Sequence, residues 1–236
     1  MKFLRNNLAN LLTLSNLFSG CLAVVFLMNG RIDLTALCLV ISLICDFFDG
    51  FVARLLKSNS PLGIQLDSLA DMVTFGFIPG LAMYQLLNDH YLEAGSLGFP
   101  YPYVGFLITL ASCLRLAIFN IDQEQKYYFK GLNTPTNTLL VFGLLYALRF
   151  QESFLDTIDQ PTFLLLVTLM SSYLLISPIR MFSLKLASKD FKALLPLLLI
   201  FVIAVVLLLA LKYVAVPFIV LTYILISLLF QKRFYS

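Results

Sequence analysis

Charged residues are scarce in this sequence. Asp, Glu, Lys and Arg make up only 12% of its 236 residues, whereas 60% are hydrophobic, and the mean hydropathy is +0.92. Because a soluble domain is about 25% charged and about half apolar, this composition excludes a soluble globular protein and indicates a chain with several membrane spans. The net charge is only +3 and there is no basic run, so nothing supports nucleic-acid binding.

Residues that commonly bind soft metals are also few, with four cysteines and one histidine. The cysteines all fall within apolar segments: Cys21, Cys38, Cys45 and Cys113. None forms the paired spacing of a metal site, so we interpret them as reduced thiols that behave as small hydrophobic side chains. His90 lies in a polar stretch beside Asp89, and we assign it no function.

Long apolar runs fill most of the chain and predict an all-α membrane bundle of about eight transmembrane helices. The expected spans are 8–29, 34–56, 66–88, 101–120, 134–150, 161–178, 191–211 and 213–230. The first run is long enough to span and lacks a signal-peptide cleavage pattern. No domain boundary or internal duplication is visible. We therefore expect one integral-membrane domain over residues 1–236, with a core at about 8–178 and a C-terminal helical hairpin at about 191–230.

Positive charges are unevenly distributed between the two ends of the predicted bundle. Eight spans place both termini on one side, and that side would carry thirteen of the sixteen Lys and Arg residues. By the positive-inside rule, this side is cytoplasmic. We expect a protein of the cytoplasmic (inner) membrane whose two termini face the cytoplasm.

Four aspartates lie in the second and third predicted spans. Asp46 and Asp49 are three residues apart and Asp67 and Asp71 are four apart, so each pair occupies one face of its helix. A short connection makes the two spans antiparallel neighbours, and the pairs can face each other near the cytoplasmic end. An ionised carboxylate inside a bilayer costs about 2.5–3.5 kcal/mol, and only two Lys or Arg residues lie between the first and last aspartate.

The cluster therefore predicts a divalent metal site. Carboxylate oxygens are the ligands that Mg²⁺ and Mn²⁺ prefer, and we expect two ions, which would clamp a diphosphate. Gly50, Ala53 and Gly63 would let a bulky ligand approach the backbone, although small residues in membrane helices also serve helix packing. Arg54 could bind phosphate or hold an aspartate.

These residues together form a specific signature. The run from Asp46 to Arg54, followed by the run from Gly63 to Asp71, matches the pattern D-x2-D-G-x2-A-R, then G-x3-D-x3-D, at all eight fixed positions. On this signature the sequence resembles the CDP-alcohol phosphotransferase family. The resemblance implies a six-helix core, a homodimer, a metal site that opens at the cytoplasmic interface, and displacement of CMP from a CDP-linked lipid or alcohol by a hydroxyl group.

The resemblance also implies roles for individual residues. It assigns the metal site to four aspartates: Asp46, Asp49, Asp67 and Asp71. Within this set, Asp71 would be the base that deprotonates the attacking hydroxyl. It assigns room for the nucleotide to the small residues Gly50, Ala53 and Gly63.

Blocks outside the signature resemble the bacterial phosphatidylserine synthases of this superfamily, at 12–20, 67–79, 114–120, 129–135 and 183–185. The chain departs from their pattern at Asn133, where proline is expected, and at Asn137, where a small residue is expected. The implied reaction joins CDP-diacylglycerol and L-serine to give phosphatidylserine and CMP. The serine carboxylate then needs a cation, and the candidates are Arg115, which is embedded in an apolar run, followed by Arg180 and Lys130. The latter two could equally be flanking charges of membrane spans.

Several alternatives stay open. The same chemistry could use glycerol 3-phosphate or inositol phosphate as acceptor, or CDP-archaeol as donor. An ion-coupled transporter would also carry intramembrane carboxylates, but the confinement of the cluster to one helical hairpin near one face favours an enzyme. Thr13 and Asn16 in the first span could line the nucleotide pocket or bond neighbouring helices.

Overall fold

The computed structural model of the chain describes residues 2–56, 60–95, 99–122, 129–150, 159–181 and 191–234. Nearly all of these residues are helical. The helices are α1 (Lys2–Met28), α2 (Ile32–Leu55), α3 (Pro61–Asp71), α4 (Ile78–Glu93), α5 (Leu107–Ile121), α6 (Thr134–Phe150), α7 (Pro161–Ile176), α8 (Phe191–Leu211) and α9 (Ala215–Phe234). Three short helical segments lie between them. η1 (Met72–Phe77) is a π-helix, and η2 (Tyr101–Phe106) and η4 (Lys212–Val214) are 3₁₀-helices. The predicted all-α bundle is confirmed.

Length and composition suit several of these helices to a membrane. Within the described residues, four are long and apolar enough to cross one: Leu8–Met28, Ile32–Leu55, Pro61–Glu93 and Tyr101–Ile121. Shorter apolar helices cover Pro161–Ile176, Leu199–Leu211 and Ala215–Leu229. Large apolar side chains such as Phe18 and Leu209 are exposed on the outside of the bundle, as expected for side chains that face lipid.

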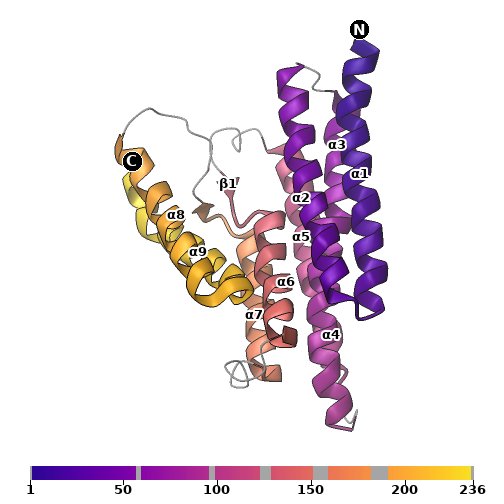
Figure 1. Cartoon of the computed structure of the whole chain (residues 1–236), viewed down its shortest axis with the longest axis vertical. Coiled ribbons are helices and arrows are strands. Elements are labelled where there is room, and N and C mark those ends of the chain that lie inside the picture. Colours follow the sequence, from indigo (N-terminus) through magenta and orange to yellow (C-terminus); the bar gives the residue numbers. More distant parts are fainter. Residues whose placement is uncertain are drawn as a thin grey trace.

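Helices α1 to α7 run up and down the long axis of the molecule, whereas the hairpin of α8 and α9 lies oblique to it (Figure 1). α1 packs on α2 and α3, α5 packs on α7, and the hairpin of α8 and α9 packs through α9 on α6. The N- and C-terminal labels both lie toward the upper part of Figure 1, and so do the end of α2 and the start of α3. Both ends of the chain thus lie toward the same end of the bundle, as an even number of crossings requires.

The hydropathy pattern places the start of the third span late. The pattern predicted residue 66, whereas α3 begins at Pro61. The reason is local: the Ser60 hydroxyl accepts a hydrogen bond from the Gly63 N–H at 3.0 Å, and proline occupies the first helical turn. A serine cap followed by proline is a favourable helix start that hydropathy does not register.

A π-helical segment, η1, directly follows Asp71. Pro79 has no N–H to donate to the Phe75 carbonyl, which would be its partner in a regular α-helix. The Thr138 hydroxyl donates to that carbonyl instead, at 2.9 Å, and the Thr109 hydroxyl donates to the Gly76 carbonyl at 3.1 Å. Side chains from α6 and α5 therefore satisfy the interrupted backbone, and they fix the helix segment that carries Asp71 against its neighbours.

The main apolar core fills mostly the half of the bundle away from the α2–α3 connection. Its fully buried members include Leu27, Ile78, Met83, Leu87 and Leu145, contributed by α1, α4 and α6. The other half contains most of the buried polar side chains, and the aspartates lie there.

Candidate active site

Three carboxylates from α2 and α3 meet at the end of the bundle where these helices are connected. Oxygens of Asp46, Asp49 and Asp67 all lie within 4.8 Å of one another. Asp49 is buried, with 5% of its surface exposed, and the other two are half-buried. Carboxylates this close repel each other unless a cation or proton lies between them. The three oxygens are hard ligands in a compact group, so they fit a divalent ion such as Mg²⁺ or Mn²⁺.

Asp71 lies beside this group, one turn beyond Asp67. It is buried, its carboxylate is within hydrogen-bonding reach of Asp46, and it accepts a hydrogen bond from Asn16 Nδ2 at 3.3 Å. The structure thus brings all four predicted aspartates together. It also distinguishes Asp71, which is held by an amide, from the three carboxylates that converge on one another.

Helix α1 supplies the side chains that hold two of the aspartates. Thr13 Oγ1 donates to Asp49 Oδ2 at 2.7 Å, and Thr13 and Asp49 are both buried. The Asn16 side-chain amide donates to Asp71, while the Asn16 backbone carbonyl accepts from the Ser42 hydroxyl at 3.3 Å. The sequence left two roles open for Thr13 and Asn16: lining the nucleotide pocket or bonding to neighbouring helices. The structure shows the second, because both side chains donate hydrogen bonds to aspartates of α2 and α3. Groups that orient metal ligands in this way tune the affinity of the site.

The small residues of the signature differ in what surrounds them. The three atoms nearest to a Cβ added at Gly50 all belong to the Arg54 guanidinium, with Nη1 closest at 3.4 Å. Close packing between helices therefore does not require glycine at this position. A Cβ at Gly63 would lie 3.1 Å from the Ser60 hydroxyl and 3.4 Å from Asn10 Oδ1, so close approach to α1 contributes at that position. Ala53 is half-buried, and Arg54 is exposed and acts electrostatically on Asp49.

A cavity outside the aspartate group has Arg115 in its lining. It measures about 210 Å³, and its lining includes Arg115, Asp122, Lys130 and Ser177. Arg115 is only 7% exposed and lies close enough to Asp71 to interact electrostatically. Its Nε has no hydrogen-bond partner among the described residues. A buried guanidinium with an unused donor is suited to an anionic group of a ligand.

Two short strands carry the other candidate cations, and Lys130 lines this cavity. β1 (Phe129–Lys130) pairs antiparallel with β2 (Arg180–Met181), and Lys130 lies opposite Arg180. Lys130 Nζ donates to Asp122 Oδ2 at 3.0 Å. The three cations predicted for the acceptor thus come from separate segments to one region, although the side chain of Arg180 lies outside the described part of the chain.

Sequence reasoning missed Asp122. It ends α5, at the position where the helix gives way to extended backbone. The available signal was an acidic residue at the predicted cytoplasmic end of a span, where cations predominate. Its contact with Lys130 depends on the path of the chain between α5 and β1, and the spacing of residues in the sequence does not predict that path.

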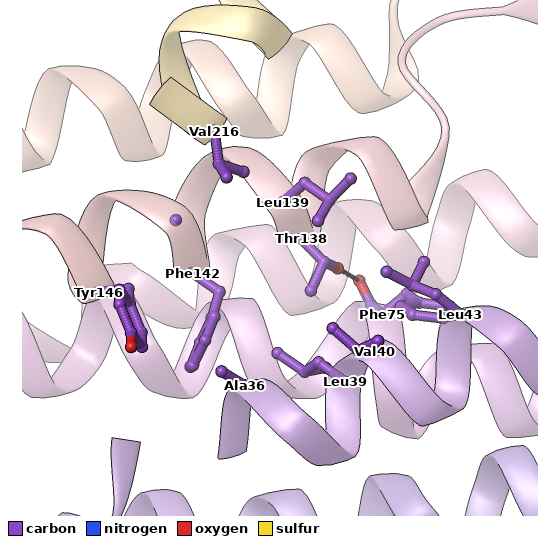
Figure 2. A pocket seen from close by; sticks show the side chains of 11 residues that line it. Ala36, Leu39, Val40, Leu43, Phe75, Thr138, Leu139, Phe142, Tyr146 and Val216 are labelled. Atoms are coloured by element: carbon purple, nitrogen blue, oxygen red, sulfur yellow. Dashed lines mark hydrogen bonds between the residues drawn. The ribbon is translucent and has the colours of Figure 1, made fainter. Parts of the chain in front are cut away.

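An apolar cavity of about 200 Å³ begins one turn deeper in the bundle (Figure 2). Residues of α2, η1, α6 and α9 line it, among them Leu43, Phe75, Phe142 and Val216. Leu43 precedes Asp46 by three residues and Phe75 follows Asp71 by four, so the cavity is next to the aspartates along both helices.

Fold and site together define an integral membrane protein with a carboxylate-rich centre suited to a divalent metal. Comparison with known proteins agrees. The chain matches the family model of CDP-alcohol phosphatidyltransferases over residues 6–174. It is 33% identical to a CDP-diacylglycerol–serine O-phosphatidyltransferase of Helicobacter pylori, over 72% of this chain and 70% of that protein. It is 30% identical to a Bacillus subtilis protein of the same name, over 74% of this chain and 89% of that protein.

An archaetidylserine synthase of Methanothermobacter thermautotrophicus is 29% identical over 57% of this chain and 55% of its own length. The chain therefore belongs to the CDP-alcohol phosphatidyltransferase family, whose members generally use divalent metal ions. The hairpin of α8 and α9 lies beyond the matched residues.

Proposed function

We propose that the protein transfers a phosphatidyl group from CDP-diacylglycerol to the hydroxyl of L-serine and releases CMP. One observation carries the acceptor assignment: the buried Arg115 lines a cavity and interacts electrostatically with Asp71, so a cation suited to a carboxylate lies near a candidate base. The names of the relatives in Helicobacter pylori and Bacillus subtilis support the same reaction.

Asp46, Asp49 and Asp67 would hold Mg²⁺ or Mn²⁺, and we propose two ions with Asp71 at the edge of the metal site. When bound, the metal would neutralise the diphosphate and stabilise the oxygen that leaves with CMP. Gly50 and Ala53 leave room beside the carboxylates for the cytidine nucleotide, with Gly63 at the start of α3. The exposed Arg54 is placed to contact a phosphate.

Asp71 takes the proton of the serine hydroxyl. The serine oxygen then forms a bond to the phosphorus that carries diacylglycerol, the bond from that phosphorus to the CMP oxygen breaks, and CMP leaves with the electron pair. Asn16 donates to Asp71 and holds the carboxylate in place before the proton moves. Arg115 binds the serine carboxylate, with Lys130 and Arg180 supplying further positive charge at the cavity.

The apolar cavity of Figure 2 is suited to an acyl chain of the donor lipid. When the diphosphate of the donor lipid is bound at the aspartates, its acyl chains start about one turn of α2 away from this cavity. From the uneven distribution of Lys and Arg along the sequence, we also propose that the active site lies near the cytoplasmic surface of the inner membrane, with both termini in the cytoplasm. We further propose a homodimer, on the basis of the family resemblance.

An acceptor panel tests the proposal. Purified protein in detergent with CDP-diacylglycerol and Mg²⁺ or Mn²⁺ should release CMP when L-serine is added, but not with glycerol 3-phosphate or inositol phosphate. Release of CMP with glycerol 3-phosphate and not with serine would refute the acceptor and keep the reaction class. An absence of CMP release with every acceptor would count against the reaction itself and would reopen the transporter alternative.

A further inference from the structure

The apolar cavity of Figure 2 follows the groove between α2 and α6. Leu43 and Thr138 lie at the end nearest the aspartates, and Ala36 and Tyr146 lie at the opposite end (Figure 2). Among the described residues, α6 packs more closely on α9 than on α2, which leaves space between α2 and α6. The cavity is therefore elongated along the two helices and leads away from the metal site.

The walls of this cavity present hydrocarbon. Phe75 and Phe142 are buried lining residues, and the Thr138 hydroxyl donates to the Phe75 carbonyl at 2.9 Å. Two further lining residues, Val40 and Leu139, are 51% and 38% exposed on the outside of the bundle. An apolar cavity with one side open toward lipid suits a hydrocarbon chain that enters from the bilayer.

Helix α9 forms another side of the cavity through Val216. A Cβ added at Gly143 would lie 3.1 Å from Val216 Cγ1 and 3.2 Å from Pro217 Cδ, so the glycine allows α9 to approach α6 this closely. This wall belongs to the C-terminal hairpin, beyond the residues that match the family model. The hairpin therefore helps to shape the cavity.

Tyr146 stands at the end of the cavity that is farthest from the aspartates. Its hydroxyl donates to Asp33 Oδ1 at 3.0 Å, and this bond crosses from α6 to α2 just beyond Ala36. Its ring also packs on Phe150, with 4.5 Å between the ring centroids. Contacts at the hydroxyl and at the ring hold this side chain in place, so it sets a fixed end to the groove.

The position of this end corresponds to a definite chain length. Asp46 and Ala36 are ten residues apart on α2, a rise of about 15 Å. An extended hydrocarbon chain with carbon–carbon bonds of about 1.5 Å advances about 1.25 Å per carbon. A chain that starts beside the aspartates thus reaches Tyr146 after about twelve carbons.

From this arrangement we infer that Tyr146 limits the length of donor acyl chain that the protein recognises. Carbons before this residue fill the cavity, and later carbons must turn out into the bilayer, where they gain nothing from the protein. This inference rests on the proposed use of CDP-diacylglycerol and adds a specificity-determining residue for the donor.

Competition between donors tests the inference. CDP-diacylglycerols with octanoyl, lauroyl, palmitoyl or stearoyl chains are mixed in equal amounts in the same detergent micelles, so every donor starts from the same hydrocarbon environment. Mass spectrometry of the phosphatidylserine products gives the ratios of kcat/KM. The wild type should prefer lauroyl to octanoyl donor by about threefold or more, because a short chain leaves part of the cavity unfilled. It should use lauroyl, palmitoyl and stearoyl donors about equally.

Two variants should move this limit in opposite directions. Ala36→Phe fills the far end of the cavity and should lower the ratio of lauroyl to octanoyl product by about tenfold, which is the usual size of an overpacking cost. Tyr146→Ala opens the end and should favour palmitoyl over lauroyl donor. Ala204→Phe is the matched control, because Ala204 is also half-buried but lies on α8, which contributes no residue to the lining.

The outcomes are distinct. Unchanged product ratios in Ala36→Phe or in Tyr146→Ala, or the same shift in Ala204→Phe, would overturn the inference. If one of the two cavity variants does not fold, the other decides. A wild-type preference that keeps rising from lauroyl to stearoyl would overturn it without any variant. If the wild type forms no phosphatidylserine from any donor, the proposed function itself is refuted.

Discussion

The hydrogen bond from Thr13 to Asp49 should control how tightly the site holds its metal. The bond is 2.7 Å long and joins two buried side chains, which are 4% and 5% exposed. A hydrogen bond to a charged group contributes about 1.5–3 kcal/mol, and removal of a group that orients a metal ligand typically costs about 10- to 100-fold in affinity or activity. Thr13→Val keeps the shape of the side chain and removes this bond. We expect the metal concentration for half-maximal activity to rise by about 10- to 100-fold.

The assay is CMP release from CDP-diacylglycerol and serine across a series of Mg²⁺ and Mn²⁺ concentrations. Thr168→Val is a matched control, because Thr168 is also buried and donates to the carbonyl of Leu164 four residues earlier, at 2.8 Å. Thr13 Oγ1 likewise lies 3.1 Å from the Ala9 carbonyl, and its single proton is shared between that carbonyl and the closer Asp49 oxygen. The two variants therefore lose the same kind of intrahelical bond, and only Thr13→Val also loses a bond to an aspartate.

The expected loss in Thr13→Val should be recovered at saturating metal, since the carboxylate itself remains. A half-maximal concentration that is unchanged, or that shifts equally in Thr168→Val, would refute the assigned role of Thr13. A loss that no metal concentration restores would show that Thr13 acts on catalysis and not on metal binding.

Three further predictions concern the same site. Asp71→Asn should lower kcat by about 100-fold or more, as expected for loss of a general base, with little change in KM for the donor; full activity would show that the base is another group. Chelation of divalent ions should abolish CMP release and added Mg²⁺ or Mn²⁺ should restore it, whereas activity in the presence of chelator would contradict a metal site. Gly50→Val should raise KM for CDP-diacylglycerol without loss of folded protein, because the three atoms nearest to a Cβ there all belong to the exposed, flexible side chain of Arg54. Gly105→Val should instead reduce the yield of folded protein, since a Cβ there would lie 2.6 Å from the Tyr84 backbone nitrogen; the reverse pattern would refute this distinction.

The sequence predicted the helices and the convergence of the aspartates well, because both follow from short-range rules. Hydropathy located the apolar helices, and helix periodicity put each aspartate pair on one face. Helix starts were less accurate: α3 begins at Pro61 because Ser60 caps it, a local bond that an average over many residues hides. The π-helical turn after Asp71 was also not predicted, although Pro79 carried a signal for an interrupted hydrogen-bond ladder.

Contacts between distant segments could not be read from the sequence. The bond from Thr13 to Asp49 joins residues 36 positions apart, and the bond from Asn16 to Asp71 joins residues 55 apart. Polar residues in a membrane helix have many possible partners, so the sequence left both residues with two open roles. The contact of Asp122 with Lys130 likewise depends on the chain that returns after α5, and neither periodicity nor charge spacing defines it.

The central claim is that this aspartate site joins a phosphatidyl group to serine. The most direct measurement supplies purified protein with CDP-diacylglycerol, labelled L-serine and Mg²⁺ or Mn²⁺, and quantifies the labelled lipid and CMP in the same sample. We predict phosphatidylserine and CMP in equal molar amounts, with neither formed by Asp49→Asn. CMP released without labelled lipid, or labelled lipid formed equally well by Asp49→Asn, would contradict the account.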